Sequence, residues 1–182
     1  AAQAAQGLTA MLAGERVAAV GAALAARFGL PCWQLTQSAT DANREALRWA
    51  RAITARRNVL VFNGCYHGSV DETQVRLGLK GTRARAGLRG VPFDVTAHTR
   101  VVEFNDPTAL ADALGDGQVA AVLCEPALTN MGMVLPQPGF PAQLRQLTRA
   151  HGTLLIIDET HTLSAGPGGG TGRDGLEPDM LV

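Results

Sequence analysis

The chain has 182 residues, of which 46% are hydrophobic and 18% charged, a composition typical of a folded domain and not of a disordered segment. Its 16 basic residues balance 16 acidic residues, so we expect neither a nucleic acid nor a membrane surface as a partner. The longest apolar run, Val17 to Ala26, is about half as long as a helix that spans a bilayer, and the first residues lack the pattern of a secretory signal.

The first two predicted elements are helices. Apolar residues recur at helical spacing over residues 8–28, and the segment 29–31 ends this helix with Gly and Pro. The polar cluster 36–41 then predicts the start of a second helix, with Ser38 or Thr40 as its N-cap. This helix is expected to reach about Thr54 and to bury Ala46, Leu47, Ala50 and Ile53.

Four short apolar runs farther along the chain predict buried strands, because strands covered on both faces lack alternation. The runs are Val59–Phe62, Val101–Phe104, Val119–Cys124 and Leu154–Asp158. Helices are predicted at 107–114 and 140–150, and an irregular Arg- and Gly-rich loop at 78–99. This alternation predicts an α/β fold, with a mostly parallel sheet, helices on both faces, and functional residues at the C-terminal strand ends.

Several common functional sites are absent from the sequence. It has no HExxH or GxSxG motif and no Cys/His cluster at metal-ligand spacing, so no metal site is expected. The tract 166–172 fails the glycine motifs of nucleotide sites and is predicted to be a flexible surface loop, which disfavours a nucleotide-binding domain. Cys32, Cys65 and Cys124 are far apart and predict no disulfide framework, which indicates a reducing, cytoplasmic location.

Two clusters could bind parts of a small ligand. Residues 38–43 place hydroxyl groups at a helix start, where free backbone N–H groups suit a phosphate. Residues 63–68 place Tyr66 and His67 between glycines just after a strand, where an aromatic ring could stack on a flat ligand. A plain N-cap and a structural loop remain the alternative interpretations.

A third cluster, residues 154–162, ends an apolar strand with two adjacent carboxylates, Asp158 and Glu159, which point to opposite sides. A carboxylate at the base of an apolar pocket needs a cationic partner to offset its desolvation. A protonated heteroaromatic nitrogen would meet this need. A phosphate site, a stacking ring and an anion for a ring nitrogen together suit pyridoxal 5′-phosphate as the cofactor.

The same residues lie in motifs that resemble those of a known family. The motifs are Gln37–Asn43, Gly64–Gly68, Glu125-Pro126 with Asn130–Gly132, Gly139–Gly152, Asp158–Thr162 and Pro178-Asp179. Their order and approximate spacing resemble the class III aminotransferases of fold type I, in the branch that includes glutamate-1-semialdehyde 2,1-aminomutase. The resemblance covers nearly the whole chain, from about Phe28 onward.

The resemblance implies roles for the matched residues. Asp158 would pair with the pyridine nitrogen of pyridoxal phosphate and serve as a catalytic residue. Tyr66 would stack against the cofactor ring. Ser38, Ala39 and Thr40 would hold the phosphate, partly through backbone N–H groups.

Four further matches are expected near the cofactor. Asn130 would lie near the phenolic oxygen, and His161 would border the same region. His67 and Glu125 also match the family pattern, and a structural role for each of them is left open.

The sequence also departs from the family pattern. Ala39 stands where the family usually has Gly, and Asp41 where it has Glu. Thr160 replaces the usual Val after Asp-Glu and adds a hydroxyl group. Residues 163–165 replace a Gly and a Phe/Tyr-Arg segment, so substrate contacts there are not carried over.

The lysine that the resemblance implies is not identified among these residues. Family members bind the cofactor covalently through a lysine a few residues beyond Pro-Asp, whereas Lys80 is the only lysine here. We expect Lys80 to be a solvated surface amine. We therefore expect residues 1–182 to be a partial large cofactor-binding domain, with the catalytic lysine just past Val182 and the N-terminal segment and small domain also outside the sequence.

The sequence thus predicts part of a pyridoxal-phosphate-dependent aminotransferase, expected as a homodimer, that moves an amino group from a small-molecule amino donor to a carbonyl acceptor. One alternative is an intramolecular aminomutase, which these residues do not separate from a transaminase. Another is a non-catalytic cofactor-binding chain.

Overall fold

The computed structural model describes residue 14 and residues 16–182, which belong to two compact units, Ala1–Leu35 and Thr36–Val182. In the first unit, helix α2 (Val17–Phe28) ends at Gly29, whose left-handed backbone (φ 72°) closes the helix. The ring of Trp33 packs on Phe28, with 5.6 Å between the centroids. The remainder of the predicted first helix, residues 8–13 and 15, lies outside the described residues.

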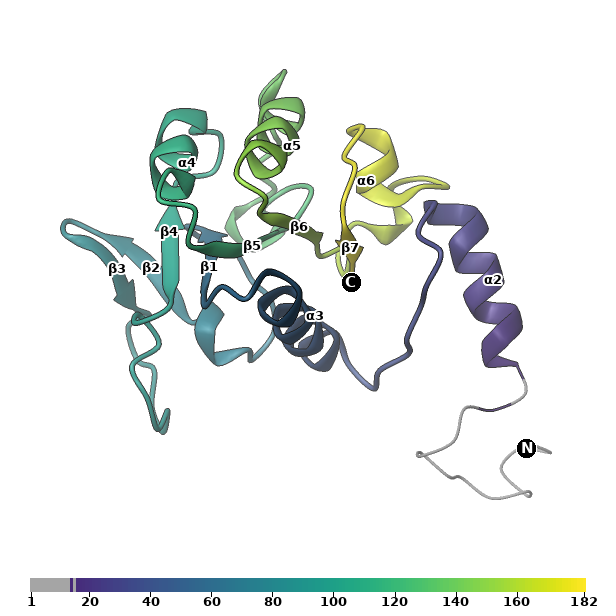
Figure 1. The fold of residues 1–182 in the computed structure, drawn as a ribbon, viewed down its shortest axis with the longest axis horizontal. Coiled ribbons are helices and arrows are strands. Elements are labelled where there is room, and N and C mark those ends of the chain that lie inside the picture. Colours follow the sequence, from purple (N-terminus) through teal and green to yellow (C-terminus); the bar gives the residue numbers. More distant parts are fainter. Residues whose placement is uncertain (1–13, 15) are drawn as a thin grey trace. The chain divides into compact units, whose positions relative to one another are not determined.

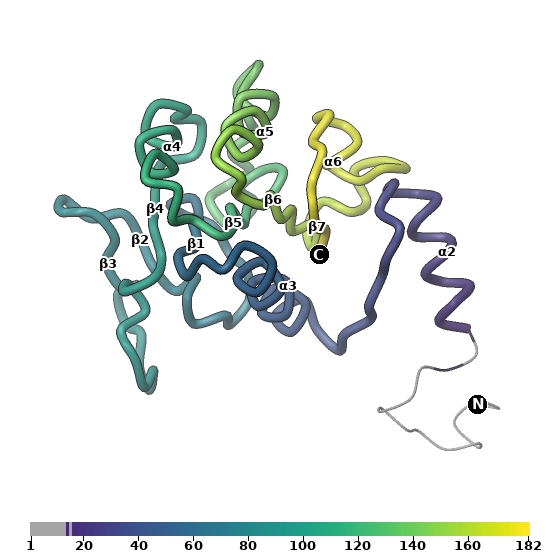
Figure 2. Tube along the Cα trace, viewed as in Figure 1, coloured from purple at the N-terminus to yellow at the C-terminus, as the bar shows by residue number. Residues whose placement is uncertain are grey.

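The second unit is built on a parallel five-stranded sheet in the order β4-β1-β5-β6-β7, which confirms the predicted α/β class (Figure 1). Its strands are β1 (Asn58–Phe62), β4 (Thr99–Val102), β5 (Val119–Cys124), β6 (Leu154–Ile157) and β7 (Met180–Leu181). Helix α3 (Ala39–Thr54) covers one face, and α4 (Pro107–Leu114) and α5 (Phe140–Ala150) cover the other (Figures 1 and 2). Every residue of β5 is buried, as its unbroken apolar sequence predicts.

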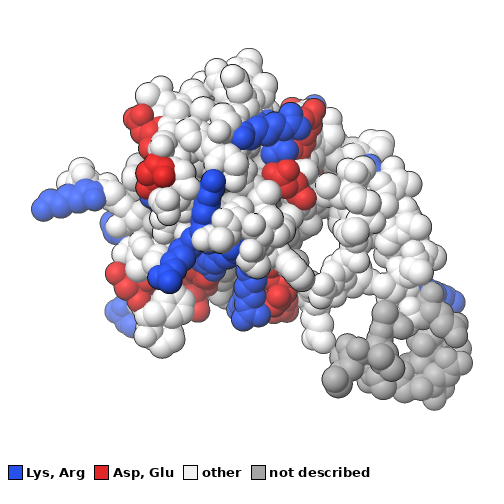
Figure 3. Space-filling view, viewed as in Figure 1, with Lys and Arg blue, Asp and Glu red and all other residues white. Residues whose placement is uncertain are grey.

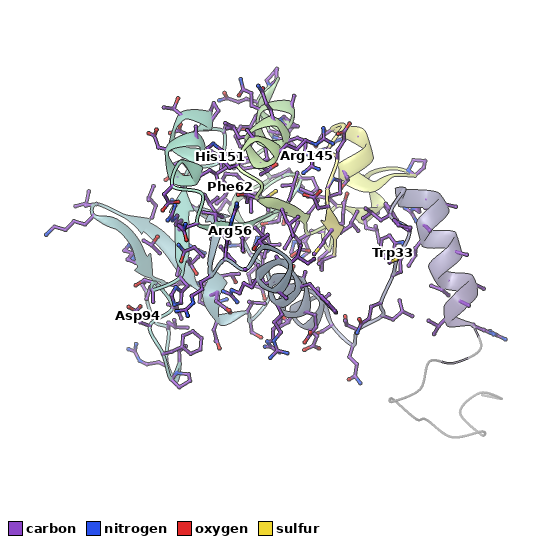
Figure 4. The ribbon with its side chains drawn as sticks, viewed as in Figure 1. Trp33, Arg56, Phe62, Asp94, Arg145 and His151 are labelled. Atoms are coloured by element: carbon purple, nitrogen blue, oxygen red, sulfur yellow. The ribbon has the colours of Figure 1, made fainter. Side chains whose placement is uncertain are left out.

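Side chains on the α4–α5 side fix the sheet to its helices. Phe62 of β1 meets Phe104 and Phe140 edge to face, with centroids 5.2 Å and 5.8 Å away. Arg145 of α5, labelled in Figure 4, makes a two-pronged ion pair with Asp179, at 2.8 Å for each hydrogen bond. Asp179 also accepts a hydrogen bond from the Leu155 amide, so the Pro-Asp motif holds the start of β7 against β6.

Arg56, between α3 and β1, binds the backbone at the N-terminal ends of β5 and β6. Its guanidinium donates to the backbone carbonyls of Val119, His151 and Gly152 at 2.9–3.0 Å. Figure 4 labels Arg56 and His151, which come from segments far apart in the sequence. These contacts lie at the N-terminal strand ends and leave the C-terminal ends free for other residues.

Several predictions about local structure are wrong. Ile53 is 63% exposed, and Asn43 occupies the buried stripe of α3 instead. The predicted irregular stretch 78–99 begins inside an antiparallel hairpin of β2 (Val75–Gly78) and β3 (Gly81–Ala84), whose polar sequence hides the strand pattern. A short helix, α6 (Gly169–Arg173), occupies the glycine-rich tract.

Short 3₁₀ turns complete the unit at Asp71–Thr73, Thr129–Met131 and Leu163–Ala165. Acidic and basic side chains are interspersed over the face shown in Figure 3. Among the described residues, no helix combines the length and apolar character that crossing a membrane requires.

Candidate functional site

Most of the predicted site residues line one cavity at the C-terminal ends of β1 and β6. Tyr66 and His67 follow β1, Asp158 follows β6, and Ser38 precedes α3. The parallel strands end at the same edge of the sheet, where functional sites of such folds form. The cavity measures about 200 Å³ and is lined by Ser38, Ala39, Thr40, Tyr66, Gly68, Asp158, Thr160 and His161.

Asp158, which is 3% exposed, lies at the centre of a hydrogen-bond network. Its Oδ2 lies 2.8 Å from both Asn43 Nδ2 and His67 Nδ1. Its Oδ1 accepts hydrogen bonds from Thr160, from the amide at 3.1 Å and from the hydroxyl at 2.5 Å. These donors match the roughly four lone-pair positions of a carboxylate.

The charges of this network follow from its geometry. Burial by itself lowers the pKa of His67, but the neighbouring Cys65 and the hydrogen bond to Asp158 raise it from 6.5 to about 10. Burial raises the pKa of Asp158, but hydrogen bonds from His67, Thr160 and Asn43 lower it below its usual value. At neutral pH the two side chains form a buried ion pair, so His67 supplies from within the chain the cationic partner that Asp158 requires.

The first turn of α3 forms the opposite side of the cavity. Ser38 is its N-cap: the hydroxyl accepts a hydrogen bond from the Asp41 amide at 3.2 Å and donates one to Asp41 Oδ2 at 2.7 Å. The amides of Ala39 and Thr40 follow it, and helix geometry gives such first-turn amides no acceptor inside the helix. They are therefore available to an anion.

Gly68 closes tightly on this turn. Its φ is +69°, and a Cβ added there would lie 2.1 Å from Thr40 Oγ1. The next residue, Ser69, donates its amide to Thr40 Oγ1 at 3.2 Å. The loop after β1 therefore reaches the start of α3 only because residue 68 has no side chain.

Tyr66 and His161 form one wall of the cavity. Their rings are nearly parallel, at 8°, with centroids 6.3 Å apart. A flat ligand between the two rings would contact both of them and would need the rings to be about 7 Å apart, more than the observed separation. Such a ligand would therefore stack on the outer face of Tyr66. Tyr66 is 42% exposed, which leaves a face free for such a contact.

Buried Glu125 holds this wall in position. It accepts hydrogen bonds from the Tyr66 amide at 3.0 Å and from the amide and hydroxyl of Thr129 at 3.2 Å and 2.8 Å. The Thr129 oxygen lies 2.6 Å from His161 Nδ1, and because its proton is donated to Glu125, it accepts from His161. Glu125 thus has a structural role, one of the two interpretations left open by the sequence.

Two residues considered in the sequence analysis lie elsewhere. Asn130 is exposed in the turn Thr129–Met131 and does not line the cavity, and its expected role stays a prediction. Lys80 is exposed at the tip of the β2–β3 hairpin, as expected of a surface amine.

Sequence reasoning missed Asn43, because a polar residue early in a helix reads as part of the cap. The available signal was its spacing of three, four and seven residues from the buried positions Ala46, Leu47 and Ala50.

Glu159 serves a different purpose from its neighbour. Its buried carboxylate accepts hydrogen bonds from the Thr162 hydroxyl and from the amides of Gly170 and Thr171. Gly169 approaches so closely that an added Cβ would lie 2.6 Å from Glu159 Oε1. The glycine-rich tract is therefore not the predicted flexible surface loop: its amides bind an internal carboxylate, and residues 169–171 are buried.

A comparison with protein families agrees with this arrangement. The sequence model described as aminotransferase class-III matches residues 2–182. The chain belongs to this family. Its members use pyridoxal phosphate, and a solved structure that is 28% identical to this chain is described as a transaminase with pyridoxal phosphate bound.

Three relatives show where the chain stands within the family. Glutamate-1-semialdehyde 2,1-aminomutase of Chloroflexus aggregans is 44% identical over 151 residues, an alignment that covers 81% of this chain and 34% of the relative. A crystal structure of a glutamate-1-semialdehyde-aminomutase from Pseudomonas aeruginosa is 56% identical with a TM-score of 0.91, and covers 99% of this chain and 40% of that one. An omega-transaminase from Sphaerobacter thermophilus is 32% identical with a TM-score of 0.86, and covers 99% of this chain and 43% of that one.

The chain therefore spans about a third to two-fifths of the length of these relatives. Its fold matches that of solved pyridoxal-phosphate enzymes. The observed cavity fits the family's cofactor on its own features: first-turn amides for a phosphate, an exposed aromatic face for a ring, and a carboxylate for a ring nitrogen.

Proposed function

We propose that the protein containing this chain is a pyridoxal-phosphate-dependent enzyme that moves an amino group, with a 2,1-aminomutase reaction as the first candidate. The observation that carries this proposal is the buried Asp158 carboxylate at the edge of a cavity that also contains the α3 start and the Tyr66 ring. In the aminomutase reaction the amino group of glutamate 1-semialdehyde shifts between carbons 2 and 1 of one molecule.

The chain's residues would divide the work of holding the cofactor. The amides of Ala39 and Thr40 bind the phosphate, Tyr66 supports one face of the ring, and Asp158 holds a proton on the ring nitrogen. When bound, the cofactor supplies an electron sink for the carbon from which a proton is removed. His67 keeps Asp158 ionised, because its positive charge lowers the pKa of that carboxyl.

The comparisons support an aminomutase over an intermolecular transaminase. Curated relatives at 38–44% identity carry the aminomutase name, whereas the omega-transaminase structure is 32% identical. A transaminase remains the second candidate because the omega-transaminase structure matches 99% of this chain with a TM-score of 0.86.

The two candidates differ in their need for a second substrate. We expect full-length protein loaded with cofactor to convert glutamate 1-semialdehyde without any external amino acceptor. Conversion only after an amino acceptor is added would favour the transaminase. Asp158→Ala should abolish most of either activity, whereas Arg83→Ala, on the exposed face of β3, should not change it; full turnover by Asp158→Ala would refute the proposed role of Asp158.

A further inference from the structure

A second cavity adjoins the first and contains two arginines that the proposed function has not used. It measures about 370 Å³ and shares Tyr66 and Gly68 with the Asp158 cavity. The other residues that line it are Ser69, Asp71, Gln74, Arg85, Leu88, Arg89, Gly90 and Val91. A ligand that reaches past Tyr66 would therefore enter it directly.

The fold fixes the backbone at the two arginines, whose side chains are exposed. The Arg85 amide donates to the Gln74 carbonyl at 2.9 Å, which continues the β2–β3 ladder by one residue. Gln74 also donates its side-chain amide to the Gly68 carbonyl at 2.9 Å, so Arg85 is linked through Gln74 to the loop that carries Tyr66. Leu88 packs against the core and its amide bonds the Arg85 carbonyl, which places Arg89 beside Arg85.

Among the described residues, the positive charges of the two arginines in this cavity are not matched by an equal number of carboxylates. Arg85 and Arg89 form no ion pair with any described residue, and their guanidinium groups contact only an amide oxygen of Gln74, at 3.4 Å, and the Leu88 carbonyl, at 3.1 Å. With Asp71 as the only acidic residue of the lining, the cavity has a net charge of +1. A guanidinium group that forms no ion pair within the protein can bind the carboxylate of a ligand through paired hydrogen bonds.

We infer that this cavity is the subsite for the single carboxylate of the amino substrate, held by Arg85 and Arg89. The inference rests on the proposed function, because it takes the reacting end of the substrate to lie beside Asp158 and Tyr66. Glutamate 1-semialdehyde has one carboxylate, at the end of the molecule away from carbons 1 and 2. The same chemistry would also suit the cofactor's phosphate, so the test separates the two anions.

The test measures binding in full-length protein loaded with pyridoxal phosphate. Two probes are titrated by calorimetry: 4-oxopentanoate, a five-carbon ketone with one carboxylate, and pentan-2-one, its uncharged counterpart. We expect the wild type to prefer 4-oxopentanoate. Replacing both arginines (Arg85→Ala with Arg89→Ala) should reduce this preference about 10- to 100-fold, the range given by loss of charged hydrogen bonds.

Two controls make the result specific. Arg83→Ala removes an exposed arginine from the same hairpin but outside this cavity and should leave the preference unchanged. Lysine at both positions (Arg85→Lys with Arg89→Lys) should restore part of it, because the charge returns without the paired geometry.

Two outcomes would overturn the inference: no preference in the wild type, or a preference that the double alanine variant retains. In the second case, weaker cofactor binding in that variant would assign the arginines to the phosphate. Because the probes are not turned over, a protein that binds 4-oxopentanoate through Arg85 and Arg89 but does not convert glutamate 1-semialdehyde would refute the proposed reaction and leave the subsite in place.

Discussion

The hydroxyl of Thr160 should compete with the cofactor for Asp158. Both oxygens of Asp158 already accept two hydrogen bonds each, so a protonated ring nitrogen can bind only if one donor leaves. Asn43 and His67 are buried side chains and the Thr160 amide is backbone, whereas Thr160 is an exposed residue whose hydroxyl can rotate. It is the donor that should be displaced.

Thr160→Val removes this donor with little change in shape. A hydrogen bond to a charged group is worth about 1.5–3 kcal/mol, and the exposure of Thr160 favours the lower end. Without the hydroxyl, the dissociation constant of pyridoxal phosphate should fall by about tenfold, the equivalent of about 1.4 kcal/mol. The cofactor-free protein should lose a similar amount of unfolding free energy, since the same bond stabilises it.

The assay is a titration of cofactor-free, full-length protein with pyridoxal phosphate, followed by absorbance, together with urea unfolding of the cofactor-free form. Thr160→Ser keeps the hydroxyl and should behave as the wild type in both. Tighter binding of pyridoxal phosphate and a lower unfolding free energy in Thr160→Val than in the wild type, with Thr160→Ser unchanged, would support the competition. Weaker or unchanged binding in Thr160→Val would refute it, because the hydroxyl would then assist the cofactor or leave it unaffected.

Three other predictions follow from the same region. Because the pKa of His67 is raised from 6.5 to about 10, its ion pair with Asp158 contributes fully to stability below pH 6.5, and this contribution is lost as the pH rises toward about 10. Urea unfolding across this range should show the decline in unfolding free energy. His67→Gln should abolish this pH dependence. Glu159→Gln should lower the unfolding free energy by about 1.5–3 kcal/mol while cofactor absorbance is kept, and a loss of cofactor with unchanged stability would contradict its structural role. Gly68→Ala should cost about 1–3 kcal/mol of stability and weaken cofactor binding, because the new methyl group would overlap Thr40; wild-type values for both would show that the loop can move away.

The sequence predicted three of the five strands closely, because these strands are short, almost wholly buried apolar runs; β4 (Thr99–Val102) begins two residues before its predicted run, and β7 was not predicted. β1, β5 and β6 follow these runs to within a residue or two, since burial on both faces leaves little room for polar residues. The hairpin β2–β3 was missed for the opposite reason. Half-exposed strands such as Gly81–Ala84 carry Gly, Thr and Arg, and only the cross-strand pairing shows that they are strands.

The sequence predicted most residues of the candidate site but not the contacts between them. The cavity brings together Ser38, Tyr66 and Asp158, each of which stood at a strand end or helix start. The cationic partner of Asp158 could not be deduced in the same way, because a histidine next to a tyrosine gives no sign of which carboxylate it meets 91 residues later.

Asp158 and Glu159 show how the structure separates two carboxylates that are equivalent in the sequence. Both are buried and both are hydrogen-bonded from within the chain, Asp158 by four donors and Glu159 by three. The donors to Glu159 are two backbone amides and a buried hydroxyl, none of which can leave without unfolding the turn that Gly169 allows. Asp158 has one exposed, rotatable donor that opens on the cavity. A buried carboxylate can bind a ligand in this cavity only if it lines the cavity and one of its donors is exchangeable, and these conditions select Asp158 as the functional member of the pair.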